Sequence, residues 1–167
     1  MKTLVIVDVQ NDFVSGVFGT DEAKAIIDPL CELIRSWKGN IIATLDTHGC
    51  NYSETREGQY RPVPHCIKPT SGWQLNDDVA KALSMKPHVK YVEKESFGQF
   101  HWDVDDDGEI VIVGLVSDIC VLNNAIIIRN LFRSRQVSVV EECCAGTTPE
   151  NHKKAMDVLK INHINIL

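Results

Sequence analysis

Short runs of β-branched and aliphatic residues without polar alternation recur along the chain, and such runs are typical of buried parallel strands. We therefore expect six strands, at Thr3–Val7, Ile41–Leu45, Val89–Val92, Glu109–Val113, Val137–Val140 and Ile164–Leu167. One stretch between them, residues 47–72, is rich in glycine, proline, histidine and charge and shows little periodicity. A loop of that length in a compact domain is usually functional.

Helix-like stretches separate the predicted strands. Apolar residues at helical spacing predict a helix that Asp21 caps and that runs to about Trp37, with Pro29 causing a kink or a later start. Further helices are expected at Leu75–Ser84, Asp118–Arg133 and Pro149–Lys160. Strands that alternate with helices predict a doubly wound α/β sheet. The length of 167 residues fits a single domain over residues 1–167.

Reactive side chains follow four of the predicted strands. Asp8 ends the first strand, Asp46 the second and Lys94 the third, and Cys120 comes after a short turn beyond the fourth. His48 lies two residues after Asp46. In open parallel sheets, ligands bind outside the carboxyl ends of the strands. We therefore expect these side chains to converge at one edge of the sheet.

Composition narrows the class of protein. With 44% hydrophobic residues, 24% charged residues and a net charge of -6, the chain is neither a disordered nor a collagen-like protein. The acidic balance argues against nucleic acid as a partner. The sequence has no apolar run near the roughly 20 residues of a membrane span, and we expect neither a membrane partner nor a secretory leader. Six cysteines without an export signal predict reduced thiols in a cytoplasmic protein.

Cys120 lies where a nucleophile could be activated. Ser117 or Asp118 could cap the helix that follows, which would place the thiol in its first turn, where backbone N–H groups and the helix dipole favour a thiolate. A nearby Lys94 would lower the thiol pKa further, and Asp8 could accept the proton. The alternative is a buried structural cysteine, the usual role of a free thiol.

A second group of residues has the composition of a metal site. Asp46, His48 and His65 offer one carboxylate and two imidazoles, which suit a catalytic transition metal with an open position, and Glu54 or Glu57 could add an oxygen ligand. The alternatives are solvated loop histidines, or a structural zinc site that includes Cys50 and Cys66. The carboxylates within Asp103–Asp107 lack the later glutamate of a calcium loop and indicate a solvated turn.

Several motifs together resemble the isochorismatase-like cysteine hydrolases, a superfamily that includes nicotinamidases. They are VIVDVQNDF (5–13), LDTH (45–48), VPHCIKPTSGW (63–73), VEKESFGQF (92–100) and GLVSDICVLNNA (114–125). The resemblance runs from residue 4 to about residue 146. It implies an α/β fold, a three-layer α/β/α sandwich with a mostly parallel six-stranded sheet.

The resemblance also implies roles for the residues that match. Asp8 would be the general base, Lys94 the lysine and Cys120 the nucleophile of a catalytic triad. A cis peptide bond is implied before the nucleophile turn, at Val116–Ser117, where it would aim the Val116 and Cys120 amides into an oxyanion hole. Phe13 would line the substrate pocket.

The D-x-H pattern with a later histidine marks the nicotinamidase branch, which implies that Asp46, His48 and His65 bind a divalent metal ion such as zinc, iron or manganese. The third histidine of many nicotinamidases is missing, which leaves Glu57, or else Glu54, to take its place. Two further departures are Pro62, where an aromatic is common, and Pro69, where glycine is usual. These differences bear on the identity of the substrate more than on the class of reaction.

The prediction is a cysteine hydrolase that cleaves a small amide, releases ammonia and forms a thioester on Cys120. The substrate partner would be a small-molecule amide, and a homo-oligomer is expected because oligomers are common in the superfamily. The alternatives are another amidase of the family, acting on a carbamoyl amide or maleamate, and a vinyl-ether hydrolase of the isochorismatase type. A non-catalytic binding module is a further alternative.

Overall fold

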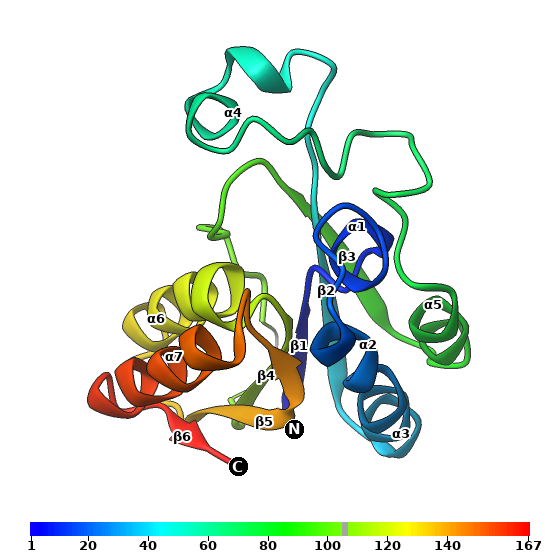
Figure 1. The fold of residues 1–167 in the computed structure, drawn as a ribbon. Coiled ribbons are helices and arrows are strands. Elements are labelled where there is room, and N and C mark those ends of the chain that lie inside the picture. The colour runs from blue at the N-terminus through cyan, green and yellow to red at the C-terminus, as the bar shows by residue number, and fades with distance from the viewer. Residues whose placement is uncertain (105–106) are drawn as a thin grey trace.

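A computed structural model describes residues 1–104 and 107–167 of the chain. Its centre is a six-stranded sheet in the order β3-β2-β1-β4-β5-β6, in which all neighbouring strands are parallel (Figure 1). The strands are β1 (Thr3–Val7), β2 (Asn40–Asp46), β3 (Val89–Lys94), β4 (Ile110–Leu115), β5 (Val137–Ala145) and β6 (Asn165–Ile166). The prediction of an α/β fold with six strands is confirmed.

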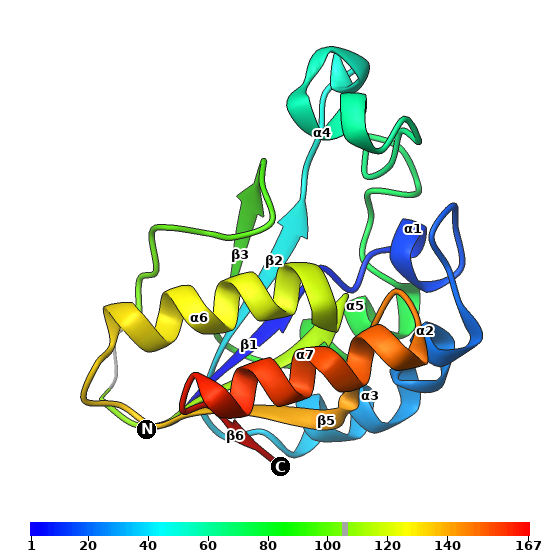
Figure 2. The ribbon, with the colours of Figure 1, turned by 60° about the vertical axis from the view of Figure 1, so that its left-hand side comes forward.

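Helices cover both faces of this sheet. On one side lie α1 (Asn11–Val14), α2 (Asp21–Ala25), α3 (Ile27–Ser36) and α5 (Asp77–Ser84), and on the other α6 (Leu122–Leu131) and α7 (Pro149–Ile161) (Figures 1 and 2). A 3-10 turn, η1 (Tyr52–Glu54), and α4 (Arg56–Tyr60) project beyond the carboxyl end of the sheet. A π-helical turn, η2 (Ser117–Val121), leads from β4 into α6. The result is the three-layer sandwich that the resemblance implies.

One predicted helix differs from the structure in two ways, each because of a single residue. The helix expected from Asp21 to Trp37 is divided into α2 and α3, because Pro29 has no N–H to donate to the carbonyl of Ala25, the last residue of α2. Its cap is also one residue earlier than predicted, since the Thr20 hydroxyl accepts the N–H of Ala23 at 3.0 Å. Proline is tolerated in the first turn of α3, where N–H groups have no helical partner.

The outer strands depart from the predicted pattern of burial. In β3, which was expected to be buried, only Lys94 is buried, because this strand forms an edge of the sheet. β5 continues to Ala145 rather than ending at Val140, and its pairing with β4 shifts between Ile112 and Gly114. The middle of β5 is therefore exposed beside this irregularity. A prediction that follows runs of buried residues ends the strand too early at such a place. The predicted solvated turn at Asp103–Asp107 includes residues 105 and 106, which lie outside the described residues.

Candidate active site

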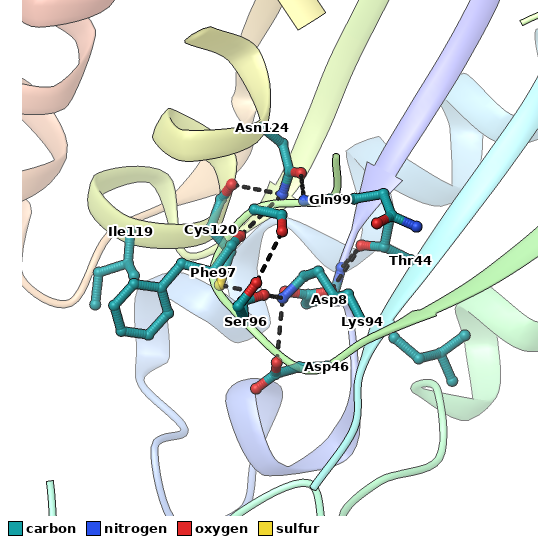
Figure 3. Close-up of polar contacts among 12 residues, drawn as sticks. Asp8, Thr44, Asp46, Lys94, Ser96, Phe97, Gln99, Ile119, Cys120 and Asn124 are labelled. Carbon is teal, nitrogen blue, oxygen red and sulfur yellow. Dashed lines mark hydrogen bonds and ion pairs between the residues drawn. The ribbon is translucent and has the colours of Figure 1, made fainter. Parts of the chain in front are cut away.

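The structure brings Asp8, Lys94 and Cys120 together at the carboxyl edge of the sheet (Figure 3). The ammonium nitrogen of Lys94 lies 2.7 Å from Asp8 Oδ2 and 3.6 Å from Cys120 Sγ. It also lies 3.1 Å from Asp46 Oδ1 and donates to the carbonyl oxygen of Ser96 at 3.0 Å. All three side chains of the predicted triad are buried, so water screens their charges little.

The backbone at the end of β1 places Asp8. This residue has a φ of 49°, in the left-handed region, which turns its side chain out of the strand direction. Thr44, on the neighbouring strand β2, holds the carboxylate by donating its hydroxyl to Asp8 Oδ1 at 2.6 Å. On the other side, Gly114 of β4 has a φ of 118°, and a Cβ there would lie 2.2 Å from the carbonyl oxygen of Val7. Glycine is therefore required where β4 passes the end of β1.

Burial sets the protonation of this group. It raises the pKa of the Cys120 thiol well above its usual value, and the negative charge of Asp8 adds to this, while Lys94 opposes it. Burial also raises the pKa of Asp8, against the attraction of Lys94. The expectation of a lowered thiol pKa is therefore wrong for the free protein, because desolvation outweighs the nearby ammonium. With its own pKa raised, Asp8 is a stronger base toward the thiol proton than a solvated carboxylate would be.

Lys94 keeps its proton in this environment. Burial alone would lower the pKa of its ammonium, but its electrostatic interactions with Asp8, Cys120 and Asp46 outweigh burial and raise it. The cation thus balances two buried carboxylates while its proton stays in place.

The turn that carries Cys120 is held differently from the prediction. Neither Ser117 nor Asp118 caps the helix: the N-cap position is Val116, which makes no side-chain cap hydrogen bond. Asp118 instead accepts the N–H and the hydroxyl of Thr147, at 2.7 and 2.6 Å. The Ser117 hydroxyl lies 2.9 Å from His152 Nδ1. Asp118 thus fastens the turn to the segment between β5 and α7, and Ser117 fastens it to α7 itself.

The cis peptide bond lies one residue earlier than the resemblance implied, between Leu115 and Val116 rather than between Val116 and Ser117. Val116 is extended and buried, and its carbonyl oxygen accepts the N–H groups of Ile119 and Val121, both at 3.1 Å. An oxyanion role for the Val116 amide remains a prediction.

Asp46, His48 and His65 form a buried cluster beside Lys94. One potential ligand atom from each lies within 4.8 Å of the others. Asp46 Oδ2 is 3.1 Å from His48 Nε2 and 3.4 Å from His65 Nε2, and Glu57 approaches the same two nitrogens at 3.9 and 3.5 Å. Within residues 1–104 and 107–167, no comparable cluster includes Cys50 or Cys66, which does not support the alternative of a structural zinc site.

The donors of this cluster fit a divalent cation. His65 Nδ1 lies 3.0 Å from the carbonyl oxygen of Val63, so a proton on Nδ1 leaves the Nε2 lone pair directed at the cluster, as in a metal-ligating histidine. The contacts of Asp46 with His48 and His65, together with the charge of Lys94, overcome burial and hold the pKa of Asp46 well below its usual range. Two imidazoles with one or two carboxylates are a set typical of zinc, iron or manganese.

Gln10 fixes the backbone of Asp46. Its buried side chain accepts the N–H of Asp46 at 2.7 Å and donates to the carbonyl oxygen of Asp46 at 2.9 Å. Sequence reasoning missed Gln10 and Thr44, each of which contacts a site residue 36 positions away. The only local signal was the position of Thr44 two residues before Asp46, on the same face of β2.

A cavity of about 690 Å³ opens beside these residues. Its lining includes His48 of the cluster, Glu57 beside it, Ile119 of the turn that carries Cys120, and Phe97 of the connection after β3. Sequence reasoning also missed Phe97. The predicted pocket residue Phe13 is buried, with its ring centroid 5.5 Å from that of His65, and its role in substrate binding stays a prediction.

Comparisons with known proteins agree with this architecture. A model of the isochorismatase domain matches residues 2–166. A nicotinamidase of Saccharomyces cerevisiae is 28% identical over 217 aligned residues, which cover 100% of this chain and 99% of the yeast protein. A solved pyrazinamidase/nicotinamidase from Streptococcus mutans has a TM-score of 0.85 at 27% identity, with 100% of both chains covered.

A pyrazinamidase of Pyrococcus horikoshii, solved in complex with zinc, has a TM-score of 0.76 at 25% identity, with 99% of this chain and 98% of that one covered. The family model and these relatives all span nearly the whole chain, and the motifs of the first and fourth strands lie where the buried Asp8, Lys94 and Cys120 meet. The chain belongs to the isochorismatase family.

Proposed function

We propose that this protein is a nicotinamidase-like amidohydrolase that cleaves a small aromatic or linear amide and releases ammonia. The observation that carries this proposal is the buried contact of Lys94 Nζ with Asp8 Oδ2, at 2.7 Å, and with Cys120 Sγ, at 3.6 Å. A nucleophile, a base and a fixed cation within one buried site are what covalent catalysis of acyl transfer requires. The relatives named as nicotinamidases support the choice of an amide as substrate.

In the first half of the reaction, Asp8 takes the thiol proton as Cys120 Sγ attacks the amide carbonyl carbon. Backbone N–H groups of the nucleophile turn would hold the oxyanion that forms. The C–N bond then breaks, the nitrogen receives the proton from Asp8, and ammonia leaves a thioester on Cys120. Lys94 remains protonated throughout and balances the negative charge, which moves between the carboxylate and the substrate.

In the second half, Asp8 removes a proton from water, which attacks the thioester carbonyl carbon. The C–S bond breaks, the proton returns from Asp8 to Cys120, and the carboxylic acid product leaves. We propose that Asp46, His48 and His65, with Glu57, hold a divalent metal ion. When bound, this ion would act as a Lewis acid. It would orient the substrate or polarise a water molecule that contacts the substrate.

Ammonia release from a panel of nicotinamide, pyrazinamide, carbamoyl amines and maleamate tests the proposed function. We expect at least one amide to react, and we expect Cys120→Ala to abolish its turnover while the fold is kept. Cys31→Ala removes another buried thiol, in α3, and serves as the matched control that retains activity. An active Cys120→Ala variant, or no reaction with any amide together with an empty metal analysis, would refute the proposal.

We also propose that the chain acts as a single domain over residues 1–167, in the cytoplasm, as a homo-oligomer with neither a nucleic acid nor a membrane partner. None of the helices in the described part of the chain is long and apolar enough to cross a membrane. Light scattering coupled to size-exclusion chromatography would measure the oligomeric state directly, and a monomer at micromolar concentration would contradict that part of the proposal.

A further inference from the structure

His152, in the first turn of α7, contacts the turn that carries Cys120. Its Nδ1 lies 2.9 Å from the hydroxyl oxygen of Ser117, three residues before the nucleophile. α7 runs beside α6 on the same face of the sheet, and its amino-terminal end packs against η2 (Figure 2). The contact thus joins an element outside the cavity to the turn that delivers the thiol.

The neighbours of the imidazole set its tautomer. His152 Nε2 lies 3.5 Å from a carboxylate oxygen of Glu141, in β5, and an ionised carboxylate can only accept a hydrogen bond. We therefore assign the proton of the neutral ring to Nε2, which leaves Nδ1 to accept the hydroxyl of Ser117. A hydroxyl, an imidazole and a carboxylate thus stand in series, as they do in a nucleophilic triad.

Ser117 cannot act as a second nucleophile, however, because it is fully buried and does not line the cavity. A buried hydroxyl needs a hydrogen-bond partner. Within residues 1–104 and 107–167, His152 is the only partner of this one. His152 therefore decides where the Ser117 side chain can stay buried, which is an effect on the position of the turn.

Ser117 lies at the start of the turn, where the oxyanion would be held. It directly follows Val116, whose amide is a predicted oxyanion donor. The carbonyl oxygen of Val116 accepts the N–H groups of Ile119 and Val121, which makes the turn a compact unit. A shift of Ser117 would therefore turn the Val116 amide away from its place.

A second attachment holds the middle of the turn independently. Asp118 keeps its two bonds to Thr147, at 2.7 and 2.6 Å, whatever happens at Ser117. Asp118 lies between Ser117 and Cys120 in the sequence. Loss of the imidazole should therefore displace the start of the turn more than it displaces the thiol.

We infer that His152 is a positioning residue of the oxyanion site: through the Ser117 hydroxyl, it holds the start of the nucleophile turn where the Val116 amide can face the carbonyl oxygen of the substrate. This inference rests on the proposed function and deepens it. His152 and Ser117 both lie outside the lining of the cavity, so substrate binding should depend on them little. Formation of the oxyanion should depend on them strongly, because one donor of an oxyanion site contributes about 10²- to 10³-fold to kcat.

The first test replaces His152 and follows turnover of the best amide in the panel. We expect His152→Ala to lower kcat about 10- to 100-fold and to leave KM within about threefold, because a small misplacement of the reacting groups affects the chemical step more than binding. His88→Ala, at an exposed position before β3, is the matched control and should alter neither constant. A raised KM with unchanged kcat in His152→Ala would overturn the inference.

Two conservative variants separate positioning from the filling of space. Asparagine can place its amide oxygen near the position of Nδ1, whereas the longer glutamine reaches the position of Nε2. We expect His152→Asn to recover kcat to within about fivefold of the wild type and His152→Gln to resemble His152→Ala. This comparison also decides the matter if His152→Ala does not fold. Equal kcat in the Asn and Gln variants would overturn the positioning role.

A double-mutant cycle tests whether His152 acts through Ser117. The effects of Ser117→Ala and His152→Ala on kcat should not add in the double variant, because each change removes the same hydrogen bond. Urea titration of each variant measures the loss of stability separately. Fully additive effects on kcat would contradict the inference.

A last measurement distinguishes failure of this inference from failure of the proposed function, because it needs no turnover. Acetaldehyde adds to Cys120: Sγ bonds to the carbonyl carbon, the electron pair of the C=O bond moves to the oxygen, and that oxygen takes the thiol proton. Iodoacetamide alkylates the same sulfur by displacing iodide and forms no oxyanion. The adduct is measured by NMR of carbonyl-labelled acetaldehyde in a Cys50→Ser background, with Cys120→Ala as the blank.

We expect His152→Ala to weaken the acetaldehyde adduct about tenfold, to change the alkylation rate by less than about threefold, and His152→Asn to restore the adduct. A protein without amidase activity that shows this pattern supports the inference although the proposed function fails. Equal effects of His152→Ala on both reagents, or no adduct in the wild type, would refute the inference even in an active amidase.

Discussion

Replacement of Asp8 by asparagine should separate two effects of this carboxylate. As a base it would accept the Cys120 proton, and as a negative charge it raises the pKa of the thiol. Asn keeps the size of Asp8 and can still bond to Thr44, whose hydroxyl can reverse its role. It cannot accept the Cys120 proton, however, and loss of a positioned general base costs about 10²- to 10⁴-fold in rate. We therefore expect Asp8→Asn to lose amide turnover by that factor.

The same variant should make the thiol more reactive toward a small alkylating agent. Burial is the larger cause of the raised pKa of Cys120, but the charge of Asp8 adds to it, and asparagine removes that part. Lys94 Nζ then remains 3.6 Å from Sγ without its closest carboxylate. At an effective dielectric constant of about 20, an ammonium at that distance attracts a thiolate by about 5 kcal/mol. Lys94 makes this contribution in both proteins, so the difference comes from the lost repulsion by Asp8: each ~1.4 kcal/mol of it lowers the thiol pKa by about one unit and multiplies the thiolate fraction about tenfold.

The assay is the second-order rate of iodoacetamide alkylation at pH 7.5, with the modified residue located by mass spectrometry in a Cys50→Ser background. We expect Asp8→Asn to raise the rate at Cys120 at least about tenfold while ammonia release is lost. Asp28→Asn, at an exposed position of α3, makes the same change of net charge and should alter neither measurement. An unchanged or slower alkylation in Asp8→Asn would refute the electrostatic reasoning, and retained turnover would refute the role of Asp8 as base.

Three other changes test separate parts of the site and fold. Thr44→Val removes the hydroxyl that donates to Asp8, so it should raise the pKa of Asp8 further, move the acid limb of kcat/KM to higher pH and lower the free energy of unfolding by about 1–3 kcal/mol in a urea titration. Glu57→Gln should weaken zinc binding by about tenfold or more in a chelator competition, whereas Glu54→Gln, at an exposed position, should not; equal affinities in all three proteins would exclude Glu57 as a ligand. Glu109 is partly buried, but hydrogen bonds from Lys2 and Ser138 outweigh burial and lower its pKa, so its stabilisation is present above about pH 4 and is lost as the pH falls through the lowered value. Glu109→Gln should therefore reduce the free energy of unfolding by about 1–3 kcal/mol at pH 7 and much less at pH 3, and an equal loss at both values would contradict this assignment.

Four of the six strands end in, or are followed by, a reactive residue that the linear pattern had already marked. Periodicity located all six strands, and the rule that parallel strands present their carboxyl ends to one edge brought Asp8, Asp46, Lys94 and Cys120 to the same place. Both inferences rest on properties of short segments, which a single sequence contains. The candidate catalytic residues and the metal-ligand candidates at the strand ends were therefore accessible without coordinates.

Other features depend on neighbours that are far apart in the sequence. The direction of the thiol pKa follows from complete burial beside Asp8, and no local pattern around Cys120 reports that burial. Gln10 and Thr44 matter through residues 36 positions away, and His152 contacts Ser117, 35 positions away. The sequence around these side chains gives no sign of their roles, because tertiary packing determines which residues they contact. The sequence alone determined the elements and the reactive groups, whereas only the tertiary structure decided how burial and long-range hydrogen bonds tune and orient them.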